Sequence, residues 1–224
     1  MQTAFNRYVH RCYTEGLSPH PTILTQLGHW RKSRGDATGA EQWYRQSLVV
    51  DDGNVDAMGA LAVLLQSQEG RQEEAERLYE RAVREHPRHV VNLGNYGLFC
   101  ADVKGDTAKA EELYHRALEE DTNHANTLYN AAVLQESIKG NIDEAMHLYR
   151  RAINARPLHA FALHNYAILL EDHSRDFDAA ETVRAKLANT IPLDLHTFPT
   201  RTRVAWISLH GSIFDLQLRR IHRM

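Results

Sequence analysis

The sequence predicts an all-α protein, an α-solenoid in which antiparallel helix pairs stack side by side. One stretch is written three times with small changes, as AERLYERAVREH at 75–86, AEELYHRALEED at 110–121 and AMHLYRRAINAR at 145–156. Within each copy, small and aromatic residues recur at the i, i+4, i+7 spacing of one helix face. Self-similarity at a fixed period of this length is the signature of stacked helical repeats.

The second helix of each pair carries the clearest register. An alanine opens the register in all five copies, and the step is always 35 residues: Ala40, Ala75, Ala110, Ala145 and Ala180. Four residues later stand Tyr44, Tyr79, Tyr114 and Tyr149, with Arg184 in the fifth copy. A glycine precedes the alanine by five residues in four copies, and we expect it to end the preceding helix in a left-handed conformation. The fifth copy has Arg175 at that place.

The first helix of each pair is predicted from an apolar stripe at the same 35-residue step. In the third copy the stripe is Leu93, Tyr96, Gly97 and Cys100, at spacing i, i+3, i+4 and i+7. The third member is small in every copy, which predicts that the two helices of a pair cross closely. The first copy keeps this pattern at Leu24, Leu27 and Gly28 with a turn that is one residue shorter.

Three segments follow from these registers. Residues 1–20 are expected to form an N-terminal helix or half repeat, with a mitochondrial transit sequence as the alternative, and residues 21–192 five repeats. Residues 193–224 form a basic and apolar tail with five arginines against two aspartates, a net charge of +3. We predict that this tail, as a helix or a hairpin, caps the last repeat. Alternatively, it binds in the protein's own groove until a partner displaces it.

The registers resemble the tetratricopeptide repeat, whose pattern runs W-x2-L-G-x2-Y, then A-x3-F/Y, then A, then P. The residues that carry the resemblance are LTQLG near 24–28 and A-ERL-Y-ER-A-VREH-P at 75–87. It implies a non-enzymatic scaffold or adaptor without a cofactor that binds another protein in a concave groove. The 35-residue period is also that of pentatricopeptide RNA-binding repeats. Their second helix typically ends in Met and Gly before Pro, whereas this chain has RAVREHP and RAINARP.

A second stripe on the first helices gives the candidate partner-binding residues. Its members are Asn95, Asn130, Asn165, Leu98, Val133, Ile168, Tyr129 and His164. The resemblance implies that the asparagines bond the backbone of an extended peptide, since a carboxamide both donates and accepts. The alternative is that they bond neighbouring helices. Acidic residues further along the stripe predict a peptide or helix with apolar anchors and basic flanks.

Composition narrows the other possibilities. The net charge is −3 over 224 residues, which argues against nucleic-acid binding, and no apolar run is long enough to cross a bilayer. Two cysteines suit a reducing compartment, so we expect a cytoplasmic protein, with a mitochondrial or cytoskeletal assembly as the alternative. His89, His124 and His159 recur at the repeat step, which predicts helix starts rather than a metal site. A structural subunit of a large assembly is the alternative function, and an RNA-binding solenoid is a third.

Overall fold

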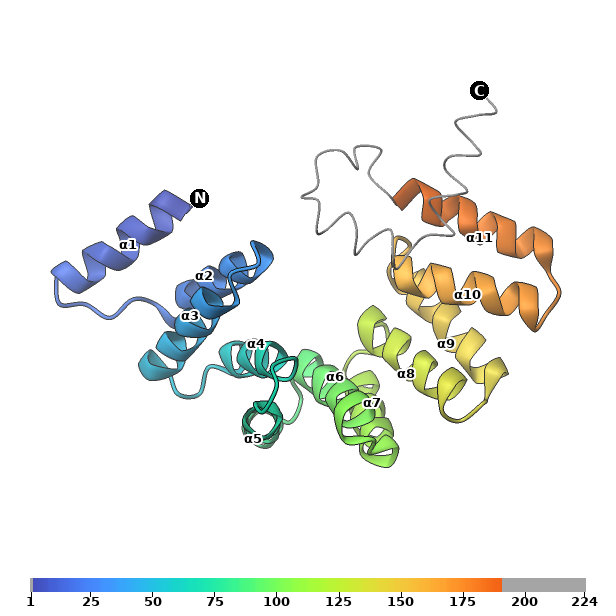
Figure 1. Ribbon diagram of the computed structural model, residues 1–224, viewed down its shortest axis with the longest axis horizontal. Coiled ribbons are helices and arrows are strands. Elements are labelled where there is room, and N and C mark those ends of the chain that lie inside the picture. The colour runs from blue at the N-terminus through green and yellow to red at the C-terminus, as the bar shows by residue number, and fades with distance from the viewer. Residues whose placement is uncertain (1, 191–224) are drawn as a thin grey trace, which may run out of the picture. The chain divides into compact units, whose positions relative to one another are not determined.

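The computed structural model describes residues 2–190, which contain eleven α-helices and one short π-helix (Figure 1). No strand occurs in this part of the chain. The described helices fall into two compact units that divide after Thr122. The predicted tail at 193–224, with both roles proposed for it, lies outside the described residues.

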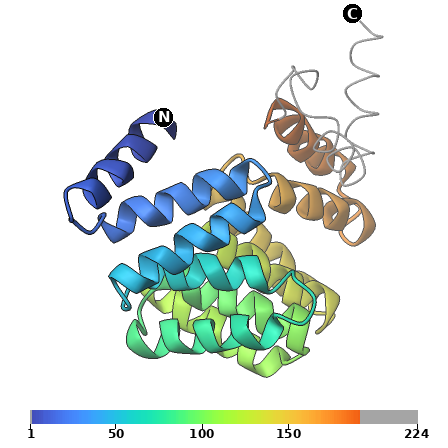
Figure 2. The same cartoon turned by 60° about the vertical axis from the view of Figure 1, so that its left-hand side comes forward.

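The first unit contains one single helix followed by three helix pairs. Helix α1 spans Gln2–Thr14 and is followed by the pairs. These are α2 (Pro21–Ser33) with α3 (Ala37–Val50), α4 (Val55–Leu65) with α5 (Gln72–Glu85), and α6 (Val90–Phe99) with α7 (Thr107–Glu120). The two helices of a pair lie side by side (Figure 2). The π-helix η1, Cys100–Lys104, continues α6 before the turn into α7.

The second unit contains two further pairs. These are α8 (Ala125–Ser137) with α9 (Ile142–Ala155), and α10 (Ala160–Asp172) with α11 (Phe177–Thr190). The second helix has 14 residues in all five pairs, whereas the first helix varies from 10 to 13 residues. The predicted all-α architecture of helix pairs is therefore confirmed.

The repeated alanines and tyrosines form the core of each pair. All five alanines of the 35-residue register are completely buried, as are Tyr44, Tyr79 and Tyr149. Glycine at the crossing point allows the closest approach. A Cβ placed on Gly28 would lie 2.3 Å from Cε1 of Tyr44. A Cβ placed on Gly97 would lie 2.5 Å from Cε1 of Tyr114. The small residue of the first stripe therefore has the role that its spacing predicts.

The turns inside the pairs end as predicted, with a left-handed residue after the first helix. Glycine has positive φ at all four register positions, at Gly35, Gly70, Gly105 and Gly140. Arg175 takes the same conformation in the fifth pair with φ of 55°, the one non-glycine residue with positive φ among the described residues. The next residue caps the second helix: Asp36, Asp106, Asn141 and Asp176 each accept a backbone N–H three residues on.

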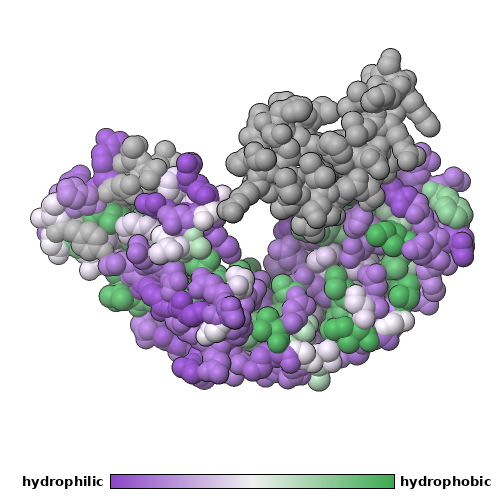
Figure 3. All heavy atoms as spheres, viewed as in Figure 1, coloured by the Kyte–Doolittle hydropathy of each residue, from purple (hydrophilic) through white to green (hydrophobic). Residues whose placement is uncertain are grey.

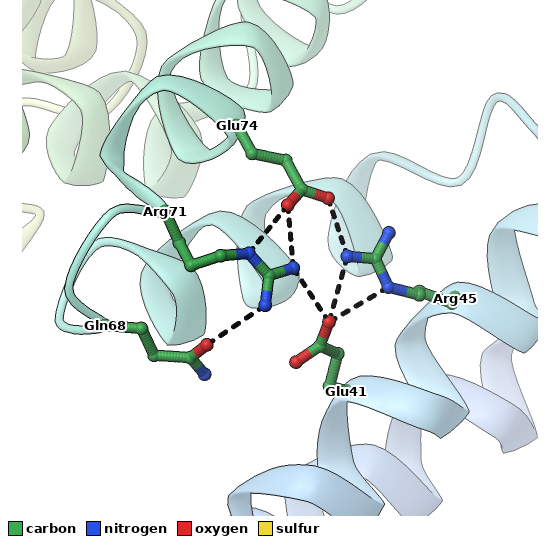
Figure 4. A network of polar contacts seen from close by, with 5 residues as sticks. All are labelled: Glu41, Arg45, Gln68, Arg71 and Glu74. Atoms are coloured by element: carbon green, nitrogen blue, oxygen red, sulfur yellow. Dashed lines mark hydrogen bonds and ion pairs between the residues drawn. The ribbon is translucent and has the colours of Figure 1, made fainter.

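The second pair departs from this capping rule, because Arg71 stands where the other copies have Asp or Asn. Instead of a cap, its guanidinium joins α5 to α3 in a network of charged side chains (Figure 4). Arg71 Nη2 lies 2.7 Å from Glu74 Oε2 and 3.0 Å from Glu41 Oε1. Arg45 contacts the same two carboxylates at 2.6 and 2.9 Å. A hydrogen bond from Arg45, which outweighs desolvation, holds the pKa of Glu74 below its usual value.

Helix α1 packs on the first pair. Val9 lies in one apolar cluster with Leu24 and Leu27 of α2. The backbone N–H of His20 donates to the hydroxyl of Tyr8 at 3.3 Å. The N-terminal segment therefore covers the apolar face that the first pair would otherwise expose.

Successive first helices in the first unit make one unusually close contact. Asn92 of α6 is 1% exposed, and its Nδ2 donates to the carbonyl of Val55 at 2.9 Å. A Cβ on Gly59 of α4 would lie 1.9 Å from Asn92 Oδ1. That oxygen is the one buried side-chain polar atom without a hydrogen bond among the described residues. Gly59 therefore provides the space that the carboxamide occupies.

Candidate partner-binding surface

The predicted binding residues lie on three first helices, and all eight are half-buried. Asn95 and Leu98 lie on α6 of the first unit, while the other six lie on α8 and α10 of the second unit. We call these eight residues the first-helix stripe. Figure 3 shows hydrophobic residues as separate patches on a largely hydrophilic surface. A groove that spans all repeats stays a prediction, and so does the role of the stripe in binding.

The asparagines of the stripe separate into two groups. Within the described residues, the side chains of Asn95 and Asn130 make no hydrogen bond, so they do not hold neighbouring helices together. Asn165 differs, because its Nδ2 donates to the hydroxyl of Tyr149 at 2.9 Å. Of the three asparagines, only Asn165 therefore has the structural role, a hydrogen bond between neighbouring helices, that was the alternative to peptide binding. That bond lies within the second unit. Both carboxamides of the other group are available to a ligand.

Asn165 belongs to a recurring polar contact that the sequence registers did not reveal. In several pairs the residue at the tyrosine position of the second helix bonds a side chain near the end of the first. The contacts are Tyr44 with His29 Nδ1 at 3.0 Å, Tyr79 with Gln66 Oε1 at 2.8 Å, and Tyr149 with Glu136 Oε2 at 2.5 Å. In the fifth pair Arg184 replaces tyrosine and forms a two-bond ion pair with Glu171. We call this contact the hydroxyl clasp.

The hydroxyl clasp changes the charge that the stripe offers to a partner. Glu136 and Glu171, two of the acids expected to attract basic flanks, are engaged by Tyr149 and Arg184. Asp102 and Asp172 are exposed and form no ion pair within the described residues. Partial desolvation of its carboxyl group nevertheless raises the pKa of Asp102 above its usual value. The acidic character expected of the stripe therefore rests on these two aspartates.

Aromatic side chains gather around Tyr129 in the second unit. Its ring centroid lies 5.1 Å from that of His159 and 6.0 Å from that of Phe161, which is 46% exposed. His159 is the N-cap of α10, and its Nδ1 accepts the backbone N–H of Ala162 at 3.2 Å. The interpretation of the repeated histidines as helix-start residues is confirmed, since His89 caps α6 in the same way and His124 precedes α8. The first turn of α10 therefore supports one edge of the stripe.

The capping role makes the second unit sensitive to pH. Nδ1 of His159 can accept a hydrogen bond only when it is unprotonated. Burial lowers the pKa of His159 below 6.5, and Arg156 adds to this effect, although a backbone hydrogen bond opposes it. Stability from this group is therefore complete above pH 6.5. It declines as the pH falls through the lowered pKa, because the unfolded chain binds the proton first.

We expect His159→Asn to remove the His159 share of this pH dependence, because asparagine caps helices and does not titrate. Urea unfolding followed by far-UV circular dichroism at pH 7.5 and pH 5.0 measures it. The loss of stability between the two pH values should be smaller in the variant than in the parent. His10→Asn, at an exposed position of α1 where the side chain forms no ion pair within the described residues, is the matched control and should leave the difference unchanged. An unchanged difference in His159→Asn as well would contradict the prediction.

Other kinds of site find no support in the described part of the chain. No group of three or more His, Cys, Asp or Glu side chains there could hold a metal ion. No helix among these residues is long and apolar enough to cross a membrane. Cys12 and Cys100 are both buried and unpaired, and burial raises the pKa of the Cys100 thiol to about 11. A buried, protonated thiol is a poor nucleophile.

Five antiparallel helix pairs with close small-residue crossings place this chain in the class of α-helical repeat proteins. Residues 57–91 match the family model of the tetratricopeptide repeat. The structure of Pseudomonas aeruginosa PilF superposes with a TM-score of 0.68 and 22% identity, covering 91% of this chain and 92% of that one. One repeat of the chain therefore matches the tetratricopeptide-repeat model, and the chain shares its fold with solved proteins of that kind, so the sequence-based resemblance is confirmed. A comparison with curated proteins gives no match.

Two further solved structures share the fold at low identity. A thermophilic tetratricopeptide-repeat protein from Thermus thermophilus has a TM-score of 0.63 and 22% identity, covering 75% of this chain and 88% of that one. Human IFIT1, solved as a dimer with m7Gppp-AAAA, has a TM-score of 0.62 and 17% identity. The match covers 84% of this chain and 47% of IFIT1. At these identities the likeness concerns the fold alone.

Proposed function

We propose that this chain is a non-enzymatic scaffold that binds a peptide or helix of a partner protein on the first-helix stripe. The observation that carries the proposal is the pair of unbonded carboxamides at Asn95 and Asn130, each three residues before a half-buried aliphatic side chain. An amide that neither accepts nor donates within the fold can do both for an extended backbone. The aliphatic neighbours, Leu98 and Val133, would contribute by excluding water from apolar anchors of the partner.

The partner that fits best carries apolar anchors and a basic flank. Asp102 and Asp172 leave a small unpaired negative charge on the stripe, which favours Lys or Arg beside the anchors. We also propose that the chain acts without a cofactor. The expected cytoplasmic location also remains a proposal.

A peptide selected on the purified full-length chain from a random phage-displayed dodecapeptide library provides a defined probe. We expect Leu98→Ser, Val133→Ser and Ile168→Ser, combined in one variant, to weaken this peptide at least tenfold by isothermal calorimetry. The reason is that each buried aliphatic side chain contributes about 1.5–3 kcal/mol. The matched control combines Val49→Ser, Ile138→Ser and Phe177→Ser, which change exposed apolar residues outside the stripe. Equal affinity of the triple variant and the parent, with both folded, would exclude the stripe as the binding surface.

The human neighbour bound to m7Gppp-AAAA makes RNA the second candidate ligand. Nucleic-acid binding depends steeply on salt because bound counterions are released. We expect no such dependence for this chain, whose net charge is −3. Fluorescence anisotropy of a labelled capped RNA at two salt concentrations distinguishes the two candidates.

A further inference from the structure

The third helix pair lacks the hydroxyl clasp that most other pairs have. In the second and fourth pairs the acceptor stands 13 residues before the tyrosine, at Gln66 and Glu136. The corresponding residue before Tyr114 is Ala101, which has no polar side-chain atom. Tyr114 makes no hydrogen bond through its side chain within the described residues. Its hydroxyl is therefore without the partner that this position has elsewhere.

The ring of Tyr114 is nevertheless held as firmly as the others. The residue is 3% exposed, and its ring lies against Gly97 so closely that a Cβ there would be 2.5 Å from Cε1. The ring therefore cannot swing away to satisfy its hydroxyl elsewhere. The one side-chain polar atom in the described residues that is both shut off from solvent and unpartnered is Asn92 Oδ1. The hydroxyl of Tyr114 consequently retains an opening to the surface.

The backbone beside this hydroxyl also differs from the other pairs. After α6 the chain forms η1, the π-helix Cys100–Lys104, and such single π-helical turns are frequently found at functional sites. Asp102 lies in this turn and forms no ion pair within the described residues. Asn95 and Leu98 of the first-helix stripe precede Asp102 by seven and four residues. An unpartnered donor, an unpaired carboxylate and an unbonded carboxamide therefore belong to this one pair.

The charge states of the Tyr114 hydroxyl and the Asp102 carboxylate determine which ligand chemistry fits. Burial raises the pKa of Tyr114 well above its usual value, and the nearby Asp102 and Cys100 raise it further, so the hydroxyl stays a neutral donor. A donor with an opening to the surface recognises an oxygen acceptor. A carboxylate ligand would be repelled by Asp102, so a neutral carbonyl oxygen fits better.

We propose that the Tyr114 hydroxyl is a ligand-binding donor that recognises a neutral amide carbonyl of the bound partner. The carbonyl comes from the main chain or from an Asn or Gln side chain, and it supplies the acceptor that Ala101 lacks. The inference rests on the proposed function, because it names a subsite next to the first-helix stripe. It also explains why the third pair differs from its neighbours in both side chain and backbone.

The test uses the selected dodecapeptide and two variants of the full-length chain. Tyr114→Phe removes only the hydroxyl and should weaken the peptide about three- to tenfold, the usual range for one neutral hydrogen bond. Ala101→Gln supplies the acceptor found in the second pair, so it should satisfy Tyr114 internally and weaken the peptide by a similar factor. Tyr79→Phe is the matched control, because that hydroxyl is already bonded to Gln66. It should lower stability and leave affinity unchanged.

An alanine scan of the peptide identifies the source of the carbonyl. If one Asn or Gln side chain supplies it, a double-mutant cycle will show coupling: the loss of affinity from replacing that residue and the loss from Tyr114→Phe will not add. If the main chain supplies it, no side chain will couple to Tyr114. Unchanged affinity in both Tyr114→Phe and Ala101→Gln, with the stripe triple variant still defective, overturns this inference and leaves the proposed function standing. A library that yields no peptide dependent on the stripe overturns both.

Discussion

Tyr79→Ala is expected to lower the free energy of unfolding by about 3–5 kcal/mol, the range for removing a large buried aromatic side chain. Tyr79 is completely buried in the first unit. Its ring stacks on Tyr96 with a centroid separation of 5.4 Å, and Phe99 lies at 5.5 Å. Because both neighbours belong to α6, the substitution opens a cavity between two successive helix pairs. A loss at the lower end of the range would mean that α6 moves in to fill it.

Urea unfolding measured by tryptophan fluorescence follows this change, since Trp30 and Trp43 both lie in the first unit. Trp206→Phe in every variant removes the third tryptophan, which lies outside the described residues. Tyr79→Phe is the matched control, because it removes only the hydrogen bond to Gln66 and should cost about 0.5–1.5 kcal/mol. Equal losses in the two variants would show that the hydroxyl, and not the stacked ring, matters.

Gly28→Ala should destabilise the first unit by about 1–3 kcal/mol, the usual effect of overpacking a core. Replacing glycine by alanine inside a helix normally stabilises it by up to about 1 kcal/mol, so a loss of stability here would show that the close crossing outweighs helix propensity. Here the new Cβ would lie 2.3 Å from a ring carbon of Tyr44, which is completely buried and cannot turn away. The two helices of the pair must therefore separate.

Gly53→Ala is the matched control for this substitution. The nearest atom to its new Cβ would be Asp51 Oδ1, at 3.5 Å, which is an ordinary contact. We expect its free energy of unfolding to stay within about 0.5 kcal/mol of the parent. In the second pair the matching position holds Ala62, which is completely buried. The same register position therefore carries glycine in one pair and alanine in another, with a different distance between the two helices. If Gly28→Ala were stabilising, the crossing in the first pair would be as loose as in the second.

Much of the fold could be predicted because it depends on local spacing. The repeated alanine marks each second helix, and glycine at Gly35, Gly70, Gly105 and Gly140 marks the left-handed turn, since both signals act within a few residues. The repeated histidines were likewise predictable as helix starts. Arg175 shows the limit of this reasoning. The glycine register does not extend to this position, yet the same turn forms there with φ of 55°.

The candidate site was less predictable, because its state depends on contacts between helices. The asparagine register predicted one role for Asn95, Asn130 and Asn165, but only Asn165 is bonded, and its bond depends on where Tyr149 points. The hydroxyl clasp uses three kinds of partner, His29, Gln66 and a glutamate, and the first of them stands 15 rather than 13 residues before its tyrosine, so no single register marks it. Its absence beside Tyr114 carries information only once the other clasps are known.

The contact between Gly59 and Asn92 couples the residue types that two positions in successive repeats can accept. A side chain at position 59 and a carboxamide at position 92 would occupy the same space, since Asn92 Oδ1 lies 1.9 Å from the missing Cβ. Two repeats later, in the second unit, the matching positions hold Tyr129 and Ala162, the large residue first and the small one second. Such a pair is expected to covary among homologues, so that glycine at 59 is retained wherever asparagine occurs at 92.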